Sequence, residues 1–469
     1  MSQPRVIPVR AAAGGVAGPY APTSDPAALL ARYDRPGPRY TSYPPANLWR
    51  DDVGGDDLAT ALRRVGARGT PVALYAHLPF CMAKCLYCGC NATVTRHARV
   101  VDEYLDDLER ELDLVTAALG ARVPAVQLHW GGGTPNFLDE AQLARAAALF
   151  RDRFAIAADA EWSIECDPRL VTPAQMAAVR AAGFGRVSYG VQDLDADVQA
   201  AIGRPQAEAL VRRAVETARA AGIGALNLDL MYGLPRQTRR SFAATLEAAI
   251  ALRPERLAVF GYAHVPWLKP HQRRIDEGAL PDGPARFALW RRAVDRLEDA
   301  GYRWIGLDHF ALADDPLAVA AADGTLHRNF MGYTTMPAEE LIGVGCSAIS
   351  DVDRLYAQGE PRLGAWRTAV RGGRLPVVRG WRLTAAESAR RTAIMRLMCD
   401  LALPLDALGD DVATVRARLA PLADDGLVTV DASRITVTPL GRWFLRNVCM
   451  ALDALLPARG EAPAFSRTV

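Results

Sequence analysis

Four of the eight cysteines lie in one short stretch, and three of these have the spacing of an iron–sulfur site. Cys81, Cys85 and Cys88 form the pattern C-x3-C-x2-C, which allows three thiolates of one loop to bind a single [4Fe–4S] cluster. One iron of the cluster then lacks a protein ligand and is free to bind a small molecule. Because a cluster that only stores electrons has all its irons ligated by protein, this spacing favours an enzyme.

Two other uses of cysteine fit the pattern less well. A structural zinc site usually takes two C-x2-C pairs from separate loops, and a disulfide framework is typical of chains too short to bury a core. No second pair occurs in the sequence, where the other cysteines are isolated, at Cys166, Cys346, Cys399 and Cys449. For Cys90 three interpretations stay open: a fourth ligand, a redox or proton-transfer group, or a packing residue.

The loop resembles the signature of the radical S-adenosylmethionine superfamily, in which an aromatic residue precedes the third cysteine, as Tyr87 does here. Four further motifs resemble those of the oxygen-independent coproporphyrinogen III oxidase family. They are Pro-Gly-Pro-Arg-Tyr-Thr-Ser-Tyr-Pro at 36–44, Gly-Gly-Gly-Thr-Pro at 131–135, His-Arg-Asn-Phe at 327–330 and Arg-Asn-Val-Cys-Met at 446–450. Because these matches run in order from about residue 30 to the end, the resemblance covers nearly the whole chain.

The resemblance implies two cofactors. A [4Fe–4S] cluster is expected on Cys81, Cys85 and Cys88, together with S-adenosylmethionine, of which the family holds two molecules near the cluster. Contacts to S-adenosylmethionine are expected from Tyr75, Tyr87, Gly132, Gly133, Thr134, Glu165, Gln192, Arg204, Asp229, Ala263 and Ile349. The residues expected to take part in catalysis are Tyr75, His77, Cys90 and Glu165.

The elements that must hold these residues alternate between strand and helix, the pattern of a parallel sheet with helical crossovers. Candidate strands are Val72 to Leu78, Ala125 to Trp130, Glu161 to Asp167, Arg186 to Gln192, Leu226 to Met231 and Arg256 to Tyr262. Helices are predicted between them, at Val101 to Leu119, Glu140 to Phe150, Pro173 to Ala182, Gln206 to Ala221 and Arg240 to Leu252. Six such units predict an α/β fold, a partial (β/α)6 TIM-like barrel of the radical S-adenosylmethionine type.

Along these strands the side chains alternate between an apolar and a polar face. In the segment 226–230 the leucines share one face, while Asn227 and Asp229 share the other. The same alternation puts Tyr75, Glu165 and Gln192 on polar faces. Because an ordinary barrel interior is filled with branched apolar side chains, a polar interior predicts a polar ligand near the carboxyl ends of the strands. The alternative is a network of buried polar groups that satisfy one another.

The sequence divides into three predicted parts: an N-terminal flexible extension and substrate-covering arm (1–44), the barrel with an extension (45–375) and a mainly helical, substrate-capping domain (376–469). Residues 1–23 show no periodic pattern and are expected to be mobile, and Asp25 is a predicted N-cap for a helix ending near Tyr33. A strand pair between 427 and 437 gives the last part a winged-helix pattern. We favour substrate capping over DNA binding because its net charge is unremarkable.

Composition sets limits on the partners. The formal net charge is only +2 and 23% of residues are charged, which is typical of a globular protein without a nucleic-acid partner. Lys84 and Lys269 are the only lysines, so the P-loop lysine motif is absent. No apolar run reaches the ~18–20 residues of a membrane span. Free cysteines and an oxygen-sensitive cluster favour the cytoplasm, and a monomer is expected.

By resemblance, the expected reaction is oxidative decarboxylation of two propionate side chains of coproporphyrinogen III to vinyl groups in haem biosynthesis. The substrate partner is then a porphyrinogen, whose carboxylates make Arg39 and Arg446 candidate anchors. An electron donor and an electron acceptor are also needed. The alternatives are a haem carrier of the same fold or a different radical reaction. Met331 stands where the family usually has Gln, and a Met side chain has no amide to donate a hydrogen bond from that position.

Overall fold

A computed structural model describes residues 26–336, 338–456 and 465–468. The predicted mobility of residues 1–23 and the predicted N-cap at Asp25 lie outside these residues. The helix expected after them is present as α1 (Pro26–Tyr33), which begins with Pro at its first turn. None of the described helices is both long enough and apolar enough to cross a membrane.

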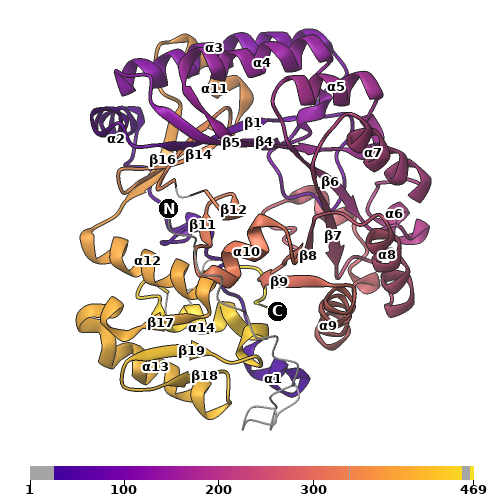
Figure 1. Cartoon of the computed structure of the whole chain (residues 1–469), viewed down its shortest axis with the longest axis vertical. Helices are drawn as coiled ribbons and strands as arrows, with labels where there is room; N and C mark the ends of the chain where they lie inside the picture. The colour runs from indigo at the N-terminus through magenta and orange to yellow at the C-terminus, as the bar shows by residue number, and fades with distance from the viewer. Residues whose placement is uncertain (1–25, 337, 457–464, 469) are drawn as a thin grey trace, which may run out of the picture.

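Six parallel strands form the centre of one 12-stranded sheet, in the order in which they occur along the chain. They are β1 (Val72–Leu78), β4 (Pro124–Gly132), β5 (Ala155–Cys166), β6 (Arg186–Gln192), β7 (Ala225–Tyr232) and β8 (Arg256–Gly261). Helices between them lie on the outside of the curved sheet (Figure 1), namely α3 (Ala98–Leu119), α4 (Glu140–Arg153), α5 (Pro173–Ala181), α7 (Glu208–Ala220) and α8 (Arg239–Ala251). This arrangement confirms the predicted partial barrel.

Strands outside the six predicted units extend both edges of this sheet. β13 (Glu340–Val344) pairs in parallel with β1, so the chain returns from far along the sequence to the first strand. Beyond it lie the antiparallel strands β14 (Ile349–Val352), β15 (Leu355–Gly359) and β16 (Val377–Arg382). At the other edge β10 (His309–Leu312) pairs with β8 and then with β9 (Tyr302–Gly306). The barrel is therefore open, with different strands at its two edges.

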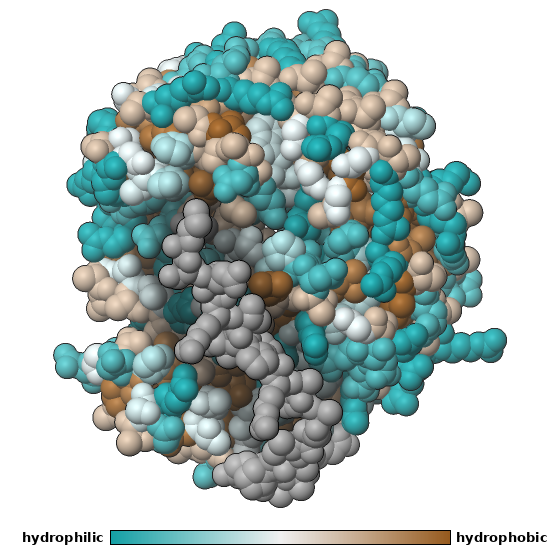
Figure 2. Space-filling model, in the orientation of Figure 1, coloured by the Kyte–Doolittle hydropathy of each residue, from teal (hydrophilic) through white to brown (hydrophobic). Residues whose placement is uncertain are grey.

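The last part of the chain forms a separate lobe below the barrel in Figure 1, coloured orange and yellow. It contains α12 (Ala385–Asp400), α13 (Val412–Asp424), α14 (Leu445–Leu452) and a small sheet of β17 (Ala402–Pro404), β18 (Val428–Val430) and β19 (Arg434–Val437). The predicted boundary at residue 376 falls just before β16, an edge strand of the large sheet. On the face shown in Figure 2, hydrophilic residues are widely spread and hydrophobic ones occur in small groups.

The N-terminal segment is held against this C-terminal lobe. The Asn447 side chain donates a hydrogen bond to the main-chain oxygen of Tyr33, with 2.9 Å between the atoms. The Arg446 guanidinium donates to the carbonyls of Pro38 (2.9 Å) and Arg467 (2.6 Å), and also to that of Gly37. Segments from the two ends of the described chain are thus joined beside the barrel opening.

The alternation predicted for the strands is confirmed in β7. Leu226, Leu228 and Leu230 are fully buried, whereas Asn227 and Asp229 line an internal cavity. Each buried leucine contributes roughly 1.5–3 kcal/mol to folding. Apolar side chains therefore attach the strands to the outer helices, and the polar faces are left free to line the barrel.

Candidate active site

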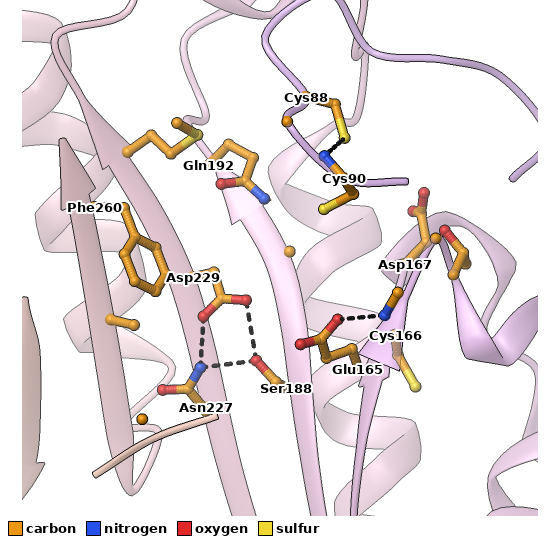
Figure 3. Close-up of a pocket in the computed structure, with 18 of the residues that line it drawn as sticks. Cys88, Cys90, Glu165, Cys166, Asp167, Ser188, Gln192, Asn227, Asp229 and Phe260 are labelled. Carbon is orange, nitrogen blue, oxygen red and sulfur yellow. Dashed lines mark hydrogen bonds between the residues drawn. The ribbon is translucent and has the colours of Figure 1, made fainter. Parts of the chain in front are cut away.

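A cavity of about 630 Å³ occupies the barrel interior, next to the cysteine loop. Residues from the polar faces of β4 to β8 line it, together with the loop between β1 and α3 (Figure 3). Several polar atoms at its wall are buried and have no hydrogen-bond partner, among them Gln127 Oε1 and Arg204 Nε. Because an unpaired buried polar atom costs on the order of 1–3 kcal/mol, the wall is suited to a polar ligand.

The three predicted cluster ligands line this cavity together. Cys81 Sγ lies 3.4 Å from Thr134 Oγ1, Cys85 Sγ accepts a hydrogen bond from Arg204 Nη1 at 3.5 Å, and Cys88 Sγ accepts one from the Cys90 amide at 3.4 Å. Among the described residues, no three His, Cys, Asp or Glu side chains form a group that could hold a single metal ion. Cys90 is exposed and also lines the cavity, so its three interpretations stay open.

Glycines at the end of β4 allow the cysteine loop to pack closely on the barrel. Gly132 has a φ of +124°, and a Cβ atom there would lie 2.9 Å from the ring of His77. A Cβ atom at Gly133 would lie 2.6 Å from the main chain of Pro79, and the Gly133 amide donates to the carbonyl of Leu78 at 2.9 Å. Larger residues would push the loop away from the strand ends, which explains the glycine run in the sequence.

Tyr75 and His77, which share one face of β1, lie behind the cavity wall. His77 Nε2 is 2.8 Å from the carbonyl oxygen of Asn91, so it carries the proton and donates it there. His77 Nδ1 then accepts a hydrogen bond from the Tyr75 hydroxyl at 3.1 Å. Burial lowers the pKa of His77, and burial raises that of Tyr75 well above its ordinary value. Both groups are therefore neutral near pH 7.

Glu165 projects from β5 into the cavity and is held as a carboxylate. It lies 3.3 Å from His129 Nε2, and its second oxygen accepts a hydrogen bond from the Gly132 amide at 3.3 Å. Burial raises its pKa, but the contacts with His129 and Gly132 outweigh burial and the net pKa is lowered. The exposed 46% of its side chain faces the cavity. An ionised oxygen is thus available to a cationic or hydrogen-bonding ligand.

Asp229 projects from β7 into the same cavity in a different environment. Its two oxygens accept hydrogen bonds from Asn227 Nδ2 at 2.7 Å and Ser188 Oγ at 3.1 Å, a triangle that Figure 3 shows. Burial and the negative charge of Glu165 raise the pKa of Asp229 to about 6. The two hydrogen bonds lower it, but by less. Asp229 is therefore ionised at neutral pH and protonated in mild acid.

Two further predicted residues lie at the carboxyl end of β6. Gln192 has a left-handed φ of 67°, and its side chain lines the cavity facing the cysteine loop (Figure 3). Arg204 donates to the carbonyl of Gly190 at 2.6 Å and lies 3.3 Å from Asp167. Since Arg204 also contacts Cys85, it links the strand end to the cysteine loop.

Comparisons with known proteins agree with this geometry. The Radical SAM superfamily model matches residues 75–249, and the HemN C-terminal domain model matches residues 383–444. Oxygen-independent coproporphyrinogen III oxidase of Escherichia coli (strain K12) is 42% identical over 450 residues, covering 94% of this chain and 98% of the relative. That of Pseudomonas aeruginosa is 41% identical over 451 residues, with 94% and 98% covered.

A solved structure gives the same result. Coproporphyrinogen III oxidase (HemN) from Escherichia coli, described as a radical SAM enzyme, superimposes with a TM-score of 0.85 at 41% identity, covering 89% of this chain and 98% of the other. This chain belongs to the oxygen-independent coproporphyrinogen III oxidase family. Membership confirms the predicted family and fold, and with them an enzyme that uses a [4Fe–4S] cluster and S-adenosylmethionine.

The residues present fit both groups. Cys81, Cys85 and Cys88 supply three thiolates on one side of the cavity, as a cluster with one open iron requires. The cavity beside them is lined by Glu165, Asp229 and other polar side chains, and its unpaired polar atoms suit a zwitterionic nucleoside. The lining of the barrel interior is therefore suited to S-adenosylmethionine.

Most predicted contact residues line the cavity together: Tyr87, Gly132, Gly133, Thr134, Glu165, Gln192, Arg204, Asp229 and Ala263. Three predicted residues do not line this cavity, namely Tyr75, His77 and Ile349. Ile349 packs beside Trp49 and Tyr356 in a separate apolar cluster. Direct contact of these three residues with S-adenosylmethionine or substrate stays a prediction. Tyr75 stacks on the cavity residue His129, and His77 contacts the carbonyl of Asn91 in the cysteine loop.

Arg446 does not have the predicted role of a carboxylate anchor. Its hydrogen bonds within the described residues go to the segments 37–38 and 466–467, and it is buried. Burial lowers its pKa to about 9. Arg39 differs, because it lines the cavity and lies 3.3 Å from Asp308. The sequence motif at 446 is therefore a clamp for the N-terminal arm.

Sequence reasoning missed residues that position the site. His129 contacts Glu165, and both Asn227 and Ser188 contact Asp229, although strand alternation had already put all three on polar faces. His271 and Gln272 hold the cysteine loop through the carbonyls of Cys88 (2.8 Å) and Tyr87 (2.9 Å). They lie in a short 3-10 helix after β8 (Pro270–Arg274), which no periodic signal in the sequence marks.

Proposed function

We propose that this chain catalyses the oxidative decarboxylation of two propionate side chains of coproporphyrinogen III to vinyl groups, giving protoporphyrinogen IX. The observation that carries the proposal is the match of about 40% identity along 94% of the chain to enzymes of that name, with the three cysteines lining one cavity that also contains Glu165 and Asp229. When bound, the cluster and S-adenosylmethionine supply the radical chemistry that removes a hydrogen atom from a propionate. Loss of CO₂ and one electron then completes each vinyl group.

The chain's own residues bind and orient the reactants. Glu165, held ionised by His129 and Gly132, accepts hydrogen bonds or pairs with a cation in the cavity. Arg39 brings the N-terminal arm to the cavity wall, where it lies 3.2 Å from the carbonyl of Gly261. This position supports the proposal that the arm covers the substrate, and a guanidinium suits a propionate carboxylate.

The remaining partners follow from the same chemistry. Each turnover needs an electron donor for the cluster and an acceptor for the electron released by the substrate. We infer two S-adenosylmethionine molecules, one for each of two groups of polar residues in the cavity, around Glu165 and around Asp229. A cytoplasmic monomer that binds neither nucleic acid nor a membrane completes the proposal, and the free cysteines support a reducing compartment.

Product analysis tests the proposal. Chain reconstituted with iron and sulfide under strictly anaerobic conditions is mixed with S-adenosylmethionine, a reductant, an electron acceptor and coproporphyrinogen III, and the products are measured by mass spectrometry. We expect protoporphyrinogen IX and two CO₂ per substrate, and no product from the Cys85→Ala variant. Haem binding without turnover would overturn the proposal in favour of a carrier, and S-adenosylmethionine cleavage without porphyrinogen loss would indicate another radical reaction.

A further inference from the structure

Large hydrophobic side chains are exposed beside the cysteine loop. Met82, Val94, Trp267 and Leu268 expose 42%, 51%, 59% and 65% of their surface. Only one other large hydrophobic residue in the described part of the chain is as exposed, Val319 on α10 (Pro316–Asp323). Exposed apolar groups that gather in one place mark an interaction site, because scattered ones need no explanation.

The two segments that carry these residues are in contact. His271 Nε2 is 2.8 Å from the carbonyl oxygen of Cys88, and Gln272 Nε2 donates to that of Tyr87 at 2.9 Å. Leu86 and Tyr87 pack against the apolar cluster that contains Ile275. Val94 itself is paired with Cys81 in a short parallel bridge of β2 (Phe80–Cys81) and β3 (Thr93–Val94). The exposed apolar groups therefore lie on the cysteine-loop region and on the segment that contacts it.

Positive charge gathers on the same two segments. Both lysines of the chain are on these segments, Lys84 on the cysteine loop and Lys269 beside Trp267 and Leu268. The exposed arginines on these segments with no ion-pair partner in the described chain are Arg96, Arg273 and Arg274. The acidic groups on these two segments are fewer, at Asp276 and Glu277, and Glu277 lies 2.9 Å from His264. A chain whose net charge is only +2 thus has a local positive excess at the cluster.

We propose that this surface binds a small acidic protein that carries single electrons, and that Met82, Lys84, Val94, Trp267, Leu268 and Lys269 form its docking patch. The carrier loses one electron and the cluster gains one, with no bond made or broken. The inference rests on the cluster that the family uses and not on the identity of the porphyrinogen. Exposed Trp267 and Met82, with basic groups on the same two segments, suit a short-lived complex in which apolar contact gives affinity and charge speeds association.

The lysine content permits a direct test of binding. A carbodiimide couples carboxylates of an acidic carrier to amines of this chain, and Lys84 and Lys269 are the only side-chain amines available. With flavodoxin as the probe and cluster-loaded chain, we expect cross-links at these two lysines that decline as salt is raised. The Lys84→Arg/Lys269→Arg variant keeps the charges and should lose the cross-links while binding flavodoxin with unchanged affinity. Coupling confined to the α-amine of Met1, or none, would overturn the proposal.

Cluster reduction tests the function of the patch without any porphyrinogen, so its outcome is independent of the proposed decarboxylation. In the Trp267→Ser/Leu268→Ser variant, we expect reduction by photoreduced flavodoxin to slow about tenfold, while reduction by dithionite is unchanged. Val319→Ser is the matched control and should alter neither rate. Equal slowing with both reductants would show that the segment only supports the cluster. Unchanged reduction rates in the Trp267→Ser/Leu268→Ser variant would also overturn the proposal. So would a raised KM for coproporphyrinogen III with dithionite as the reductant, because the patch would then be a substrate entrance.

Discussion

Two carboxylates that face the same barrel interior have pKa values shifted in opposite directions. Glu165 on β5 contacts an imidazole and a backbone amide, and its net pKa is lowered despite burial. Asp229 on β7 contacts two neutral donors and lies within the field of Glu165, and its pKa is raised to about 6. Residue type is therefore a poor guide to the pKa of a carboxyl group inside this cavity, because the neighbours of each group set the direction of its shift.

This comparison suggests a division of work. A carboxylate that stays ionised over the whole working pH range can hold a cationic cofactor group. One that titrates near pH 6 makes its contacts dependent on pH. The two groups also influence each other, since the charge of Glu165 is one cause of the raised pKa of Asp229. Substituting each in turn should therefore give different results.

The largest effect is expected from Glu165→Gln. Glutamine has no charge and only one oxygen to replace the two that contact His129 and Gly132, so S-adenosylmethionine cleavage should fall about 100-fold. The measurement is 5′-deoxyadenosine formed with dithionite under anaerobic conditions, with iron content measured to confirm a loaded cluster. Glu161→Gln on the same strand, a carboxylate paired with Arg186, is the control and should lose far less. Cleavage within threefold of normal would show that the charge of Glu165 is not needed.

A smaller effect with a distinct pH dependence is expected from Asp229→Asn. Above its pKa of about 6 the group is ionised and accepts both hydrogen bonds, so the activity of the unsubstituted chain should fall as pH is lowered through about 6. The variant should be about tenfold less active at pH 7.5 and should lack this acidic limb. The pH profile of decarboxylation measures both effects. An acidic limb that persists in the variant would assign it to another group.

A third change acts on Asp229 only through its neighbour. Asn227→Leu removes the amide that donates to Asp229 Oδ1 at 2.7 Å. Because that hydrogen bond favours the ionised form, its loss should move the acidic limb upward by about one pH unit and reduce activity about twofold at pH 7. At pH 8.5 the variant and the unsubstituted chain should be equally active. Equal losses at both pH values would mean that Asn227 acts on binding and not on the pKa.

The sequence predicted which face of each strand is polar, but not the charge states on that face. Alternation of side chains is local, so Asn227 and Asp229 could be assigned to one face from β7 alone. The contact between His129 and Glu165 joins two strands, and the charge of Glu165 acts on Asp229 across the intervening strand β6, so neither follows from a local pattern. Five of the predicted strands begin and end within two residues of the observed bounds, whereas β5 begins at Ala155, six residues before the predicted start at Glu161.

Other features were missing from the sequence for a similar physical reason. β13 pairs with β1 across most of the chain, and no local periodicity marks such a distant partner. Arg446 was a plausible anchor by residue type, yet its donors are taken by carbonyls of an arm that precedes it by about 400 residues. The type of a residue predicts which groups it can bind, whereas only the folded structure shows which of those groups it contacts.

The smallest expected effects are on thermal stability, and they should differ in sign. Because the pKa of Asp229 is raised, the folded chain holds its proton more tightly than the unfolded chain between about pH 4 and 6, so its ionised form destabilises the fold above pH 6. Asp229→Asn removes that cost and should raise Tm by about 1–3 °C at pH 7.5, an increase that disappears toward pH 4. The pKa of Glu165 is lowered, so its ionised form stabilises the fold at neutral pH and Glu165→Gln should lower Tm. Calorimetry of cluster-loaded chain without S-adenosylmethionine provides the measurement, and shifts of the same sign in both variants would mean that the two carboxylates share one environment.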